Sequence, residues 1–345
     1  MGARILATVM AGLALAPVVA AADLPGTITW DVTNRPDGEP GKVEFTLGYR
    51  SGTSRWMHSG DTALADLAGL TSAQLAAPNS MLVRFDLARD AGTFACEGSA
   101  RTGHASGDCR FTGSAAFTAS LVKRGIGTPS EPQLFTLAMS NVGNAYLAEL
   151  DRQHYARPTI DELVAAANHG VNLKWLQGMG GFGYRIGTLA AAIQMRDHGV
   201  SIKYVQALAE NGITDIQPDG LVRLRDHGVS ADYIATFRTL GYGKVPPEEL
   251  IRLRDHGVSA GYVQELASLK VTRVPTADLV RLRDHGIGAG FIADLHSQGY
   301  GDIAVEDMIR LRDLGLSGAA IRRANQDGVR RTPEELLRLR ASGKI

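Results

Sequence analysis

The sequence predicts an α+β protein in which a small, mostly antiparallel β-domain precedes an α-solenoid of about seven two-helix repeats. Three observations lead to this prediction. The tetrapeptide Arg-Asp-His-Gly recurs every 29 residues in the second half of the chain. Short runs of alternating apolar and polar residues fill the region before it. The first 22 residues follow the pattern of an export signal. We therefore expect a signal peptide at 1–22, a β-rich domain at 23–125 and the repeats at 130–345.

The N-terminal segment begins with one charged side chain, Arg4, followed by an apolar run and by small residues that end before Asp23. This order is typical of a cleavable secretory signal peptide, with cleavage after Ala22. A membrane anchor is the alternative, but the apolar run at 5–16 is shorter than the roughly 20 residues that a spanning helix needs. No later segment is long and apolar enough to span a membrane. We expect a periplasmic or extracellular protein without an integral membrane segment.

The charge balance limits the partners of the chain. It carries 36 basic and 36 acidic residues, so its formal net charge is zero. A neutral chain has no overall field that would attract nucleic acid or anionic lipid. The sequence therefore argues against nucleic acid as a partner and favours recognition by a local surface.

The two cysteines are predicted to form a disulfide, because oxidising compartments outside the cytoplasm allow such bonds to persist. Between Cys96 and Cys109 lie three glycines and no large apolar residue, and β-prone residues flank both positions. A bridge that closes a β-hairpin is the simplest interpretation. A metal-binding or redox pair is the alternative, but it would need more ligands or a closer spacing.

The first domain contains the strand-like runs and a weaker helical segment. Residues 63–76 have leucines at helical spacing and are expected to be helical or irregular. His58 and His104 are expected in polar loops, as solvated side chains. Five runs are predicted as strands: 27–32, 42–49, 81–87, 92–98 and 109–122.

Each repeat has chemical signals at the ends of two short helices. The first helix has proline and acids at its start, as at Pro247, and ends in His-Gly, as at Gly257. The second begins at a capping serine such as Ser259 and ends near a glycine. Degenerate copies extend the pattern to seven helix pairs and a final single helix. The apolar stripes are too narrow to be covered within one repeat, so we expect neighbouring repeats to stack.

Histidines recur in register at the end of the first helices. A shared metal ion is disfavoured, because packed helices lie about 8 to 10 Å apart whereas zinc ligands lie about 2 Å from the ion. We expect these side chains to cap the carbonyl ends of their helices, and a pH response remains open. The set is His169, His198, His227, His256 and His285.

Two sets of arginines also recur. The set that contains Arg252 is expected to be neutralised within its own helix, since Glu249 and Asp255 lie three residues away on either side. The other set either pairs with acids of adjacent repeats or lines a groove for an acidic ligand. Its members are Arg225, Arg254, Arg283 and Arg312.

An aromatic residue stands five positions after the turn glycine in five successive repeats, and Ala320 breaks the series. The set is Trp175, Tyr204, Tyr233, Tyr262 and Phe291. It forms either packing between repeats or a platform on which sugars or peptides stack. Exposure to solvent would favour the platform, and burial would count against it. A glycine-rich segment at 178–183 is expected to kink its repeat, since it lacks the preceding strand and the lysine of a phosphate-binding loop.

The R-D-H-G-V-S repeats, with the segments DAGTF at 90–94 and CRFT at 109–112, resemble a group of bacterial exported proteins that carry no assigned activity. The repeats are also similar to extramembrane regions of some BlaR/MecR-type sensor metallopeptidases. The resemblance covers most of the chain after the signal peptide. This sequence lacks the zinc-binding H-E-x-x-H motif and the membrane helices of those peptidases, so their catalysis is not implied here.

No catalytic residue, metal ligand or cofactor site is predicted, because the chain has no G-x-S-x-G, H-E-x-x-H or phosphate-loop motif. The sequence favours a non-enzymatic interaction scaffold of the cell envelope that binds a protein or peptide on its solenoid surface. The arginine set of Arg225 and the aromatic row are the candidate partner-binding residues. The alternative is a protein that binds cell-envelope glycan or another small ligand through these side chains or through a pocket of the β-domain.

Overall fold

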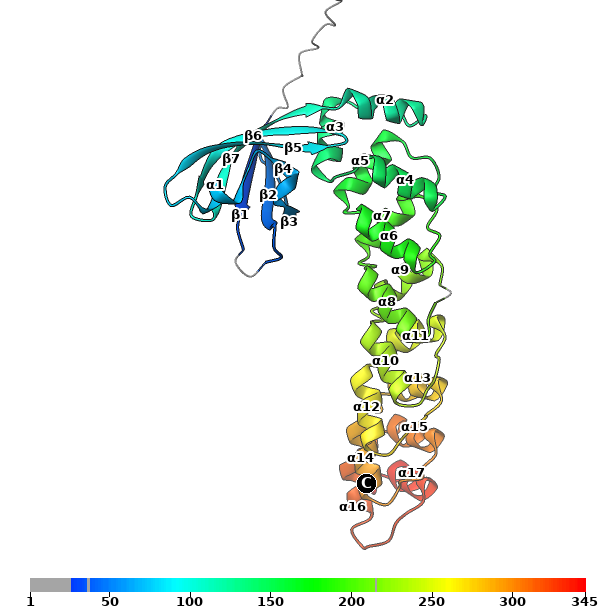
Figure 1. Cartoon of the computed structure of the whole chain (residues 1–345). Helices are drawn as coiled ribbons and strands as arrows, with labels where there is room; N and C mark the ends of the chain where they lie inside the picture. The colour runs from blue at the N-terminus through cyan, green and yellow to red at the C-terminus, as the bar shows by residue number, and fades with distance from the viewer. Residues whose placement is uncertain (1–25, 36–37, 215) are drawn as a thin grey trace, which may run out of the picture. The chain divides into compact units, whose positions relative to one another are not determined.

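The computed structural model describes residues 26–345, apart from residues 36, 37 and 215 (Figure 1). The predicted signal peptide at 1–22 lies outside the described residues. The chain divides into two compact units, one up to Asn144 and one from Ala145 to Ile345. The first contains a β-sheet and the second consists of helices, so the α+β class is confirmed.

The sheet of the first unit is antiparallel and curled, with the strand order β3-β2-β1-β7-β6-β5-β4. A short 3₁₀ helix, Leu64–Asp66, and the helix α1, Ser72–Ala76, lie in the chain between its strands. The strands are β1 Thr27–Thr33, β2 Lys42–Ser51, β3 Ser54–Ala63, β4 Leu67–Ala68, β5 Met81–Arg89, β6 Gly92–Arg101 and β7 His104–Gly113.

One face of the sheet is apolar and buried, because inward-pointing residues alternate with polar ones along each strand. Trp30 lies at the centre of this face, where its ring contacts Phe85 edge-on at 4.8 Å between centroids. Gly98 and Gly107 face each other on β6 and β7 beneath the indole. A Cβ atom at Gly98 would lie 2.7 Å from the Trp30 ring. Only glycine leaves room for the indole here.

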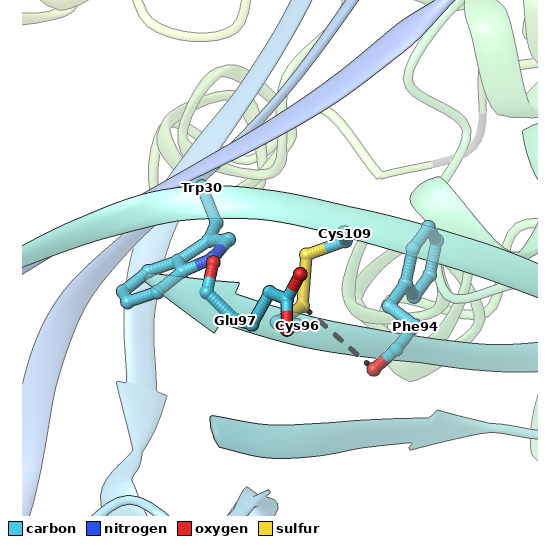
Figure 2. The surroundings of a disulfide bond; sticks show 5 residues. All are labelled: Trp30, Phe94, Cys96, Glu97 and Cys109. Atoms are coloured by element: carbon cyan, nitrogen blue, oxygen red, sulfur yellow. Dashed lines mark hydrogen bonds between the residues drawn. A yellow bond between two sulfur atoms is a disulfide. The ribbon is translucent and has the colours of Figure 1, made fainter. Parts of the chain in front are cut away.

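A disulfide joins the two central strands of this face. Cys96 on β6 and Cys109 on β7 are direct cross-strand partners, and their Cα atoms are 4.0 Å apart. Both side chains are buried. Figure 2 shows the bridge between Trp30 and Phe94. The hairpin that the sequence predicts is therefore present, with its turn at Thr102 and Gly103.

Two predictions for the first unit were wrong, and one strand was missed. The run at 109–122 is not one strand: β7 ends at Gly113, and Ala115–Lys123 forms α2, since the Ser114 side chain accepts a hydrogen bond from the Phe117 amide and caps the helix. Strand β3 was not predicted, because its polar sequence lacks an apolar alternation. His58 and His104 lie on strands β3 and β7 rather than in loops.

Helix α3, Glu131–Met139, covers one end of the buried face. The Phe135 ring lies 4.8 Å from Tyr49 and 5.4 Å from Phe111, measured between centroids. Glu131 fixes the helix start to the sheet, because its carboxylate accepts a 2.8 Å hydrogen bond from the Gly113 amide. The first helix after α2 is thus part of the first unit.

From α3 onward the described chain forms seven helix pairs and a final single helix, most of them nine residues long. The helices are α4 Asn144–Arg152, α5 Ile160–Asn168, α6 Leu173–Gly181, α7 Leu189–Asp197, α8 Ile202–Glu210, α9 Pro218–Asp226, α10 Ala231–Thr239, α11 Pro247–Asp255, α12 Ala260–Ser268, α13 Thr276–Asp284, α14 Ala289–Ser297, α15 Val305–Asp313, α16 Gly318–Ala324 and α17 Pro333–Ala341.

The helix ends follow the signals read from the sequence. Pro247 starts α11, and the chain leaves that helix through Gly257 with φ of 71°. The Val258 amide then donates a 2.8 Å hydrogen bond back to the Leu253 carbonyl, which closes the turn. Ser259 caps α12 by accepting a 3.1 Å hydrogen bond from the Tyr262 amide. The same turn and cap chemistry recurs in the neighbouring repeats.

Helices of the second unit pack against the equivalent helices of the next pair. In the first-helix series, each helix contacts the next one in the order α5, α7, α9, α11, α13, α15 and α17. In the second-helix series, the order is α6, α8, α10, α12, α14 and α16. Leucines such as Leu250, Leu253 and Leu266 are fully buried between them. The glycine-rich segment at 178–183 does not interrupt its helix before Gly181, and Gly178 and Gly180 lie inside α6. A Cβ atom at Gly178 would come within 2.5 Å of Ile202, so glycine permits close helix packing there.

The disulfide should contribute strongly to the stability of the first unit. It closes a loop with a sequence separation of 13, for which the chain-entropy estimate is about 3 kcal/mol. We expect the double substitution Cys96→Ala with Cys109→Ala to lower the free energy of unfolding of this unit by about that amount. Urea unfolding of both proteins measures the difference. Dithiothreitol should destabilise the wild type and leave the variant unchanged; equal sensitivity of the two proteins would contradict the prediction.

Candidate functional site

The aromatic row of the repeats is buried. The exposed fraction lies between 3% for Trp175 and 9% for Phe291. Each ring belongs to a second helix, and the ring donors reach into the following repeat. The contacts are Trp175 Nε1 to the Val200 carbonyl at 3.1 Å, Tyr204 Oη to Val229 at 2.8 Å, Tyr233 Oη to Val258 at 2.8 Å and Tyr262 Oη to Ile287 at 3.1 Å. We call this hydrogen bond the latch.

The latch depends on the glycine turn. Its acceptor belongs to the residue that follows the turn glycine, and that residue is itself buried, as Val229 and Val258 are. Without the hydroxyl, a buried carbonyl would lose its partner, which is costly. Phe291 holds the same position but has no donor, so the latch is absent between the repeats of α14 and α16.

The arginine set of Arg225 covers the latch. Each guanidinium lies over the ring of the preceding repeat, at a distance suited to a cation–π contact. The distances from Cζ to the ring centroid are 4.9 Å for Arg225 over Tyr204, 5.2 Å for Arg254 over Tyr233, 4.9 Å for Arg283 over Tyr262 and 5.5 Å for Arg312 over Phe291. The same side chains approach the turn glycine: a Cβ atom at Gly228 would lie 3.1 Å from Arg254.

Within the described residues none of these four guanidiniums forms an ion pair, so the expected pairing with acids was wrong. Arg283 instead donates from Nε to the Gly257 carbonyl at 3.1 Å. Two further arginines occupy equivalent places that the sequence analysis missed, although both stand in the repeat frame. Arg196 lies near Gly170, and Arg340 donates to the Leu314 carbonyl at 3.0 Å.

The other arginine set forms ion pairs along the first helices. Arg252 pairs with Glu249 of its own helix at 3.2 Å, as predicted. Several members also reach the next repeat: Arg223 binds Glu248 at 2.7 Å, and Arg310 binds Glu334 at 3.4 Å. These pairs are exposed, and each contributes little to stability by itself. They leave the first-helix surface with its charges mutually neutralised.

Each histidine of the row stands at the C-terminal cap of its helix, as expected, and its ring also contacts the next repeat. Each Nδ1 lies between 2.5 and 2.8 Å from the aspartate Oδ1 of the next Arg-Asp-His-Gly segment. The pairs are His169–Asp197, His198–Asp226, His227–Asp255, His256–Asp284 and His285–Asp313. The tetrapeptide therefore joins repeats twice, through its arginine and through its histidine.

One buried charge was not predicted. Glu149 on α4 is only 6% exposed, and Arg152 binds it through two hydrogen bonds, one of 2.9 Å. These bonds from Arg152 hold the pKa of the Glu149 carboxyl below its usual range despite burial. Gln153 also binds Glu149 and donates to the Leu176 carbonyl at 2.7 Å, which links α4 to α6. The cluster fixes the first helix pairs of the second unit.

The second helices carry a different kind of surface. Two of their exposed or half-exposed positions change from repeat to repeat, whereas the capping, latch and arginine positions stay nearly constant. We call these positions the variable row. They are Lys203, Asp232, Gly261 and Gly290 at the first position, and Gln206, Ala235, Gln264 and Ala293 at the second. The row has few charges and many small side chains.

The geometry offers no assembled metal or membrane site in the parts of the chain that the structure describes. No cluster of three His, Cys, Asp or Glu side chains there is arranged to hold a metal ion. Likewise, no described helix has the length and apolar character that crossing a membrane requires. Comparison with protein families, curated proteins and solved structures finds no match for this chain.

A reciprocal pair of substitutions tests the latch. We expect Tyr233→Phe to destabilise the second unit by about 1 to 2 kcal/mol, because the buried Val258 carbonyl loses its donor. Phe291→Tyr should stabilise it by up to about 1 kcal/mol, because the new hydroxyl can reach the equivalent carbonyl of Leu316. Urea unfolding followed by circular dichroism measures both. A neutral Tyr233→Phe would show that the ring packs without using its hydroxyl.

Burial also makes the latch sensitive to alkali. It raises the pKa of Tyr204 and of Tyr262 to about 12, whereas unfolded tyrosine titrates near about 10. The stabilisation is therefore complete below about pH 10 and is lost as the pH rises through about 12. We expect the free energy of unfolding to fall over that window, and to fall less steeply in Tyr262→Phe. Identical pH dependence of variant and wild type would contradict this assignment.

Proposed function

We propose that this chain is an exported, non-enzymatic scaffold of the cell envelope whose helix pairs form an α-solenoid that binds a protein or peptide. The division of labour among its side chains supports the proposal. The large in-register residues join repeats, through the latch, the arginine contacts and the His–Asp pairs. A chain in which each repeat contacts its neighbours in this way can present a long surface while most positions of the repeat stay the same.

The disulfide supports the proposed location. Cys96 and Cys109 are bridged and buried, and such bonds persist in the periplasm or outside the cell. The signal peptide expected at 1–22 would direct the chain there.

The variable row is the surface that best fits a partner. A position that is constant in a repeat array makes the contacts between repeats. A position that differs between repeats can distinguish one partner from another. Small residues such as Gly261 and Ala293 allow a partner backbone to approach closely. The first helices are less suited, because a partner would have to displace ion pairs such as Arg223–Glu248.

The predicted role of the arginine set and the aromatic row in partner binding stays a prediction, and their position weakens it. Tyr233 is 3% exposed, so it offers no ring face to a sugar or peptide. Glycan binding through these rings is therefore the less favoured alternative. Substituting the four arginines would remove contacts between repeats as well as any contact with a partner, so a loss of binding could not be assigned to either.

Site-specific photocrosslinking tests the proposal. We expect benzoylphenylalanine at Gln206 and at Gln264 to give the same protein or peptide adduct in intact envelopes. The control is the same group at Arg252, which is exposed on α11 of the same repeat as Gln264. Gln206→Arg in the chain labelled at Gln264 should reduce the adduct severalfold. Equal adducts from Arg252, or no adduct from the two glutamine positions, would contradict binding on the variable row.

A further inference from the structure

The solvent face of the sheet in the first unit is hollowed. A hollow of about 710 Å³ lies over β3, β2, β1 and β7, and a second of about 840 Å³ lies over β1, β7, β6 and β5. Thr27 and Asp108 line both, so the two hollows are adjacent. Volumes of this size are typical of ligand sites. None of the contacts in the repeats involves this face.

Two arginines oppose each other in the first hollow. Arg50 on β2 and Arg55 on β3 are direct cross-strand partners, both exposed, and both line the hollow. Like charges in this position destabilise a sheet. In the described part of the chain neither guanidinium has an ion-pair partner, although other arginines of the first unit do, such as Arg35 with Glu44 and Arg84 with Glu97. A pair of uncompensated guanidiniums in a hollow suits an anionic group, which their planar forks bind in two-point fashion.

The remaining lining favours sugar hydroxyls. The strand register places four hydroxyl side chains on the same face as the two arginines. They are Thr27, Thr29, Thr46 and Ser106, and all four line the hollow. Hydroxyls of this kind donate and accept hydrogen bonds. Met57, which is 59% exposed, adds an apolar patch against which the face of a sugar ring can lie.

The carboxylates that line the first hollow limit the class of anionic ligand that can bind there. Asp108 and Asp31 line it together with the arginines. Asp31 is engaged by His104 at 2.6 Å, and Asp108 forms no ion pair within the described residues. These acids accept hydrogen bonds from sugar hydroxyls, but they repel a ligand with a charge at every unit, such as an acidic peptide. A ligand with carboxylates spaced among hydroxyls fits both features.

We propose that this face binds a carboxylated oligosaccharide of the uronic acid type. Arg50 and Arg55 bind one sugar carboxylate, and the threonines with Asp108 bind ring hydroxyls. The chain of sugars continues into the second hollow, whose charged lining consists of Arg84, Asp86, Glu97, Asp108 and Arg110. This site is separate from the variable row and does not depend on it.

Isothermal titration of the full, disulfide-bonded chain with hexagalacturonate tests the proposal. We expect Arg50→Gln with Arg55→Gln to weaken binding at least tenfold. The matched control is Arg101→Gln, which removes one exposed arginine of the same sheet outside both hollows and should bind as the wild type does. Maltohexaose, which has hydroxyls without carboxylates, should bind at least tenfold more weakly than hexagalacturonate.

Stability gives a readout that does not rely on the ligand. Because the substitutions relieve repulsion, the double glutamine variant should melt at or above the temperature of the wild type at low salt. Should it fail to fold, Arg50→Lys with Arg55→Lys keeps both charges and should bind hexagalacturonate severalfold more weakly, since lysine lacks the fork.

Three results would overturn the proposal. The first is no binding of hexagalacturonate to the wild type. The second is unchanged binding by the arginine variants. The third is binding of hexaglutamate as tight as that of hexagalacturonate, which would assign the face to an acidic peptide.

Discussion

The hydrogen bond from a buried ring to the carbonyl after the next glycine turn links successive repeats of the second unit. It requires a left-handed residue at the turn, so glycine stands at Gly228 and Gly257 with φ of 67° and 71°. It requires a donor on the preceding second helix, which Tyr204 and Tyr233 supply. The arginine that covers the ring follows from the same geometry. The 29-residue period repeats this arrangement of ring, turn and guanidinium along the chain.

Local signals in the sequence predict the helices of the repeats well. Serine caps, first-turn prolines and exit glycines act within a few residues, and the helices begin and end where these signals stand. The roles of the in-register side chains could not be predicted in the same way. Tyr233 has its acceptor 25 residues further along the chain, and nothing near it in the sequence distinguishes a buried donor from an exposed ring. Arg254 looks like a surface charge until the ring beneath it is known.

In the first unit, the sequence predicts one contact between strands but misses a strand and a helix. The Cys96–Cys109 hairpin could be predicted because both cysteines and the turn lie in one short stretch. Strand β3 could not, since its partner β2 supplies the apolar face and its own residues are mostly polar. The arginine pair in the hollow was missed for the same reason, because Arg50 and Arg55 become neighbours only through the register of that strand. Helix α2 was missed because Phe117 and Leu121, both buried, suit a strand as well as a helix.

The direction of the latch has a consequence for folding during synthesis. In every case the donor precedes its acceptor, by 25 residues. A chain that emerges from a narrow pore with its N-terminus first can therefore form each latch as soon as the next glycine turn has passed through. No repeat waits for the distant C-terminus, and its contacts remain short in sequence, which favours rapid folding. The unfinished end exposes the apolar surface of about one repeat at a time, so little of the chain is open to aggregation during synthesis.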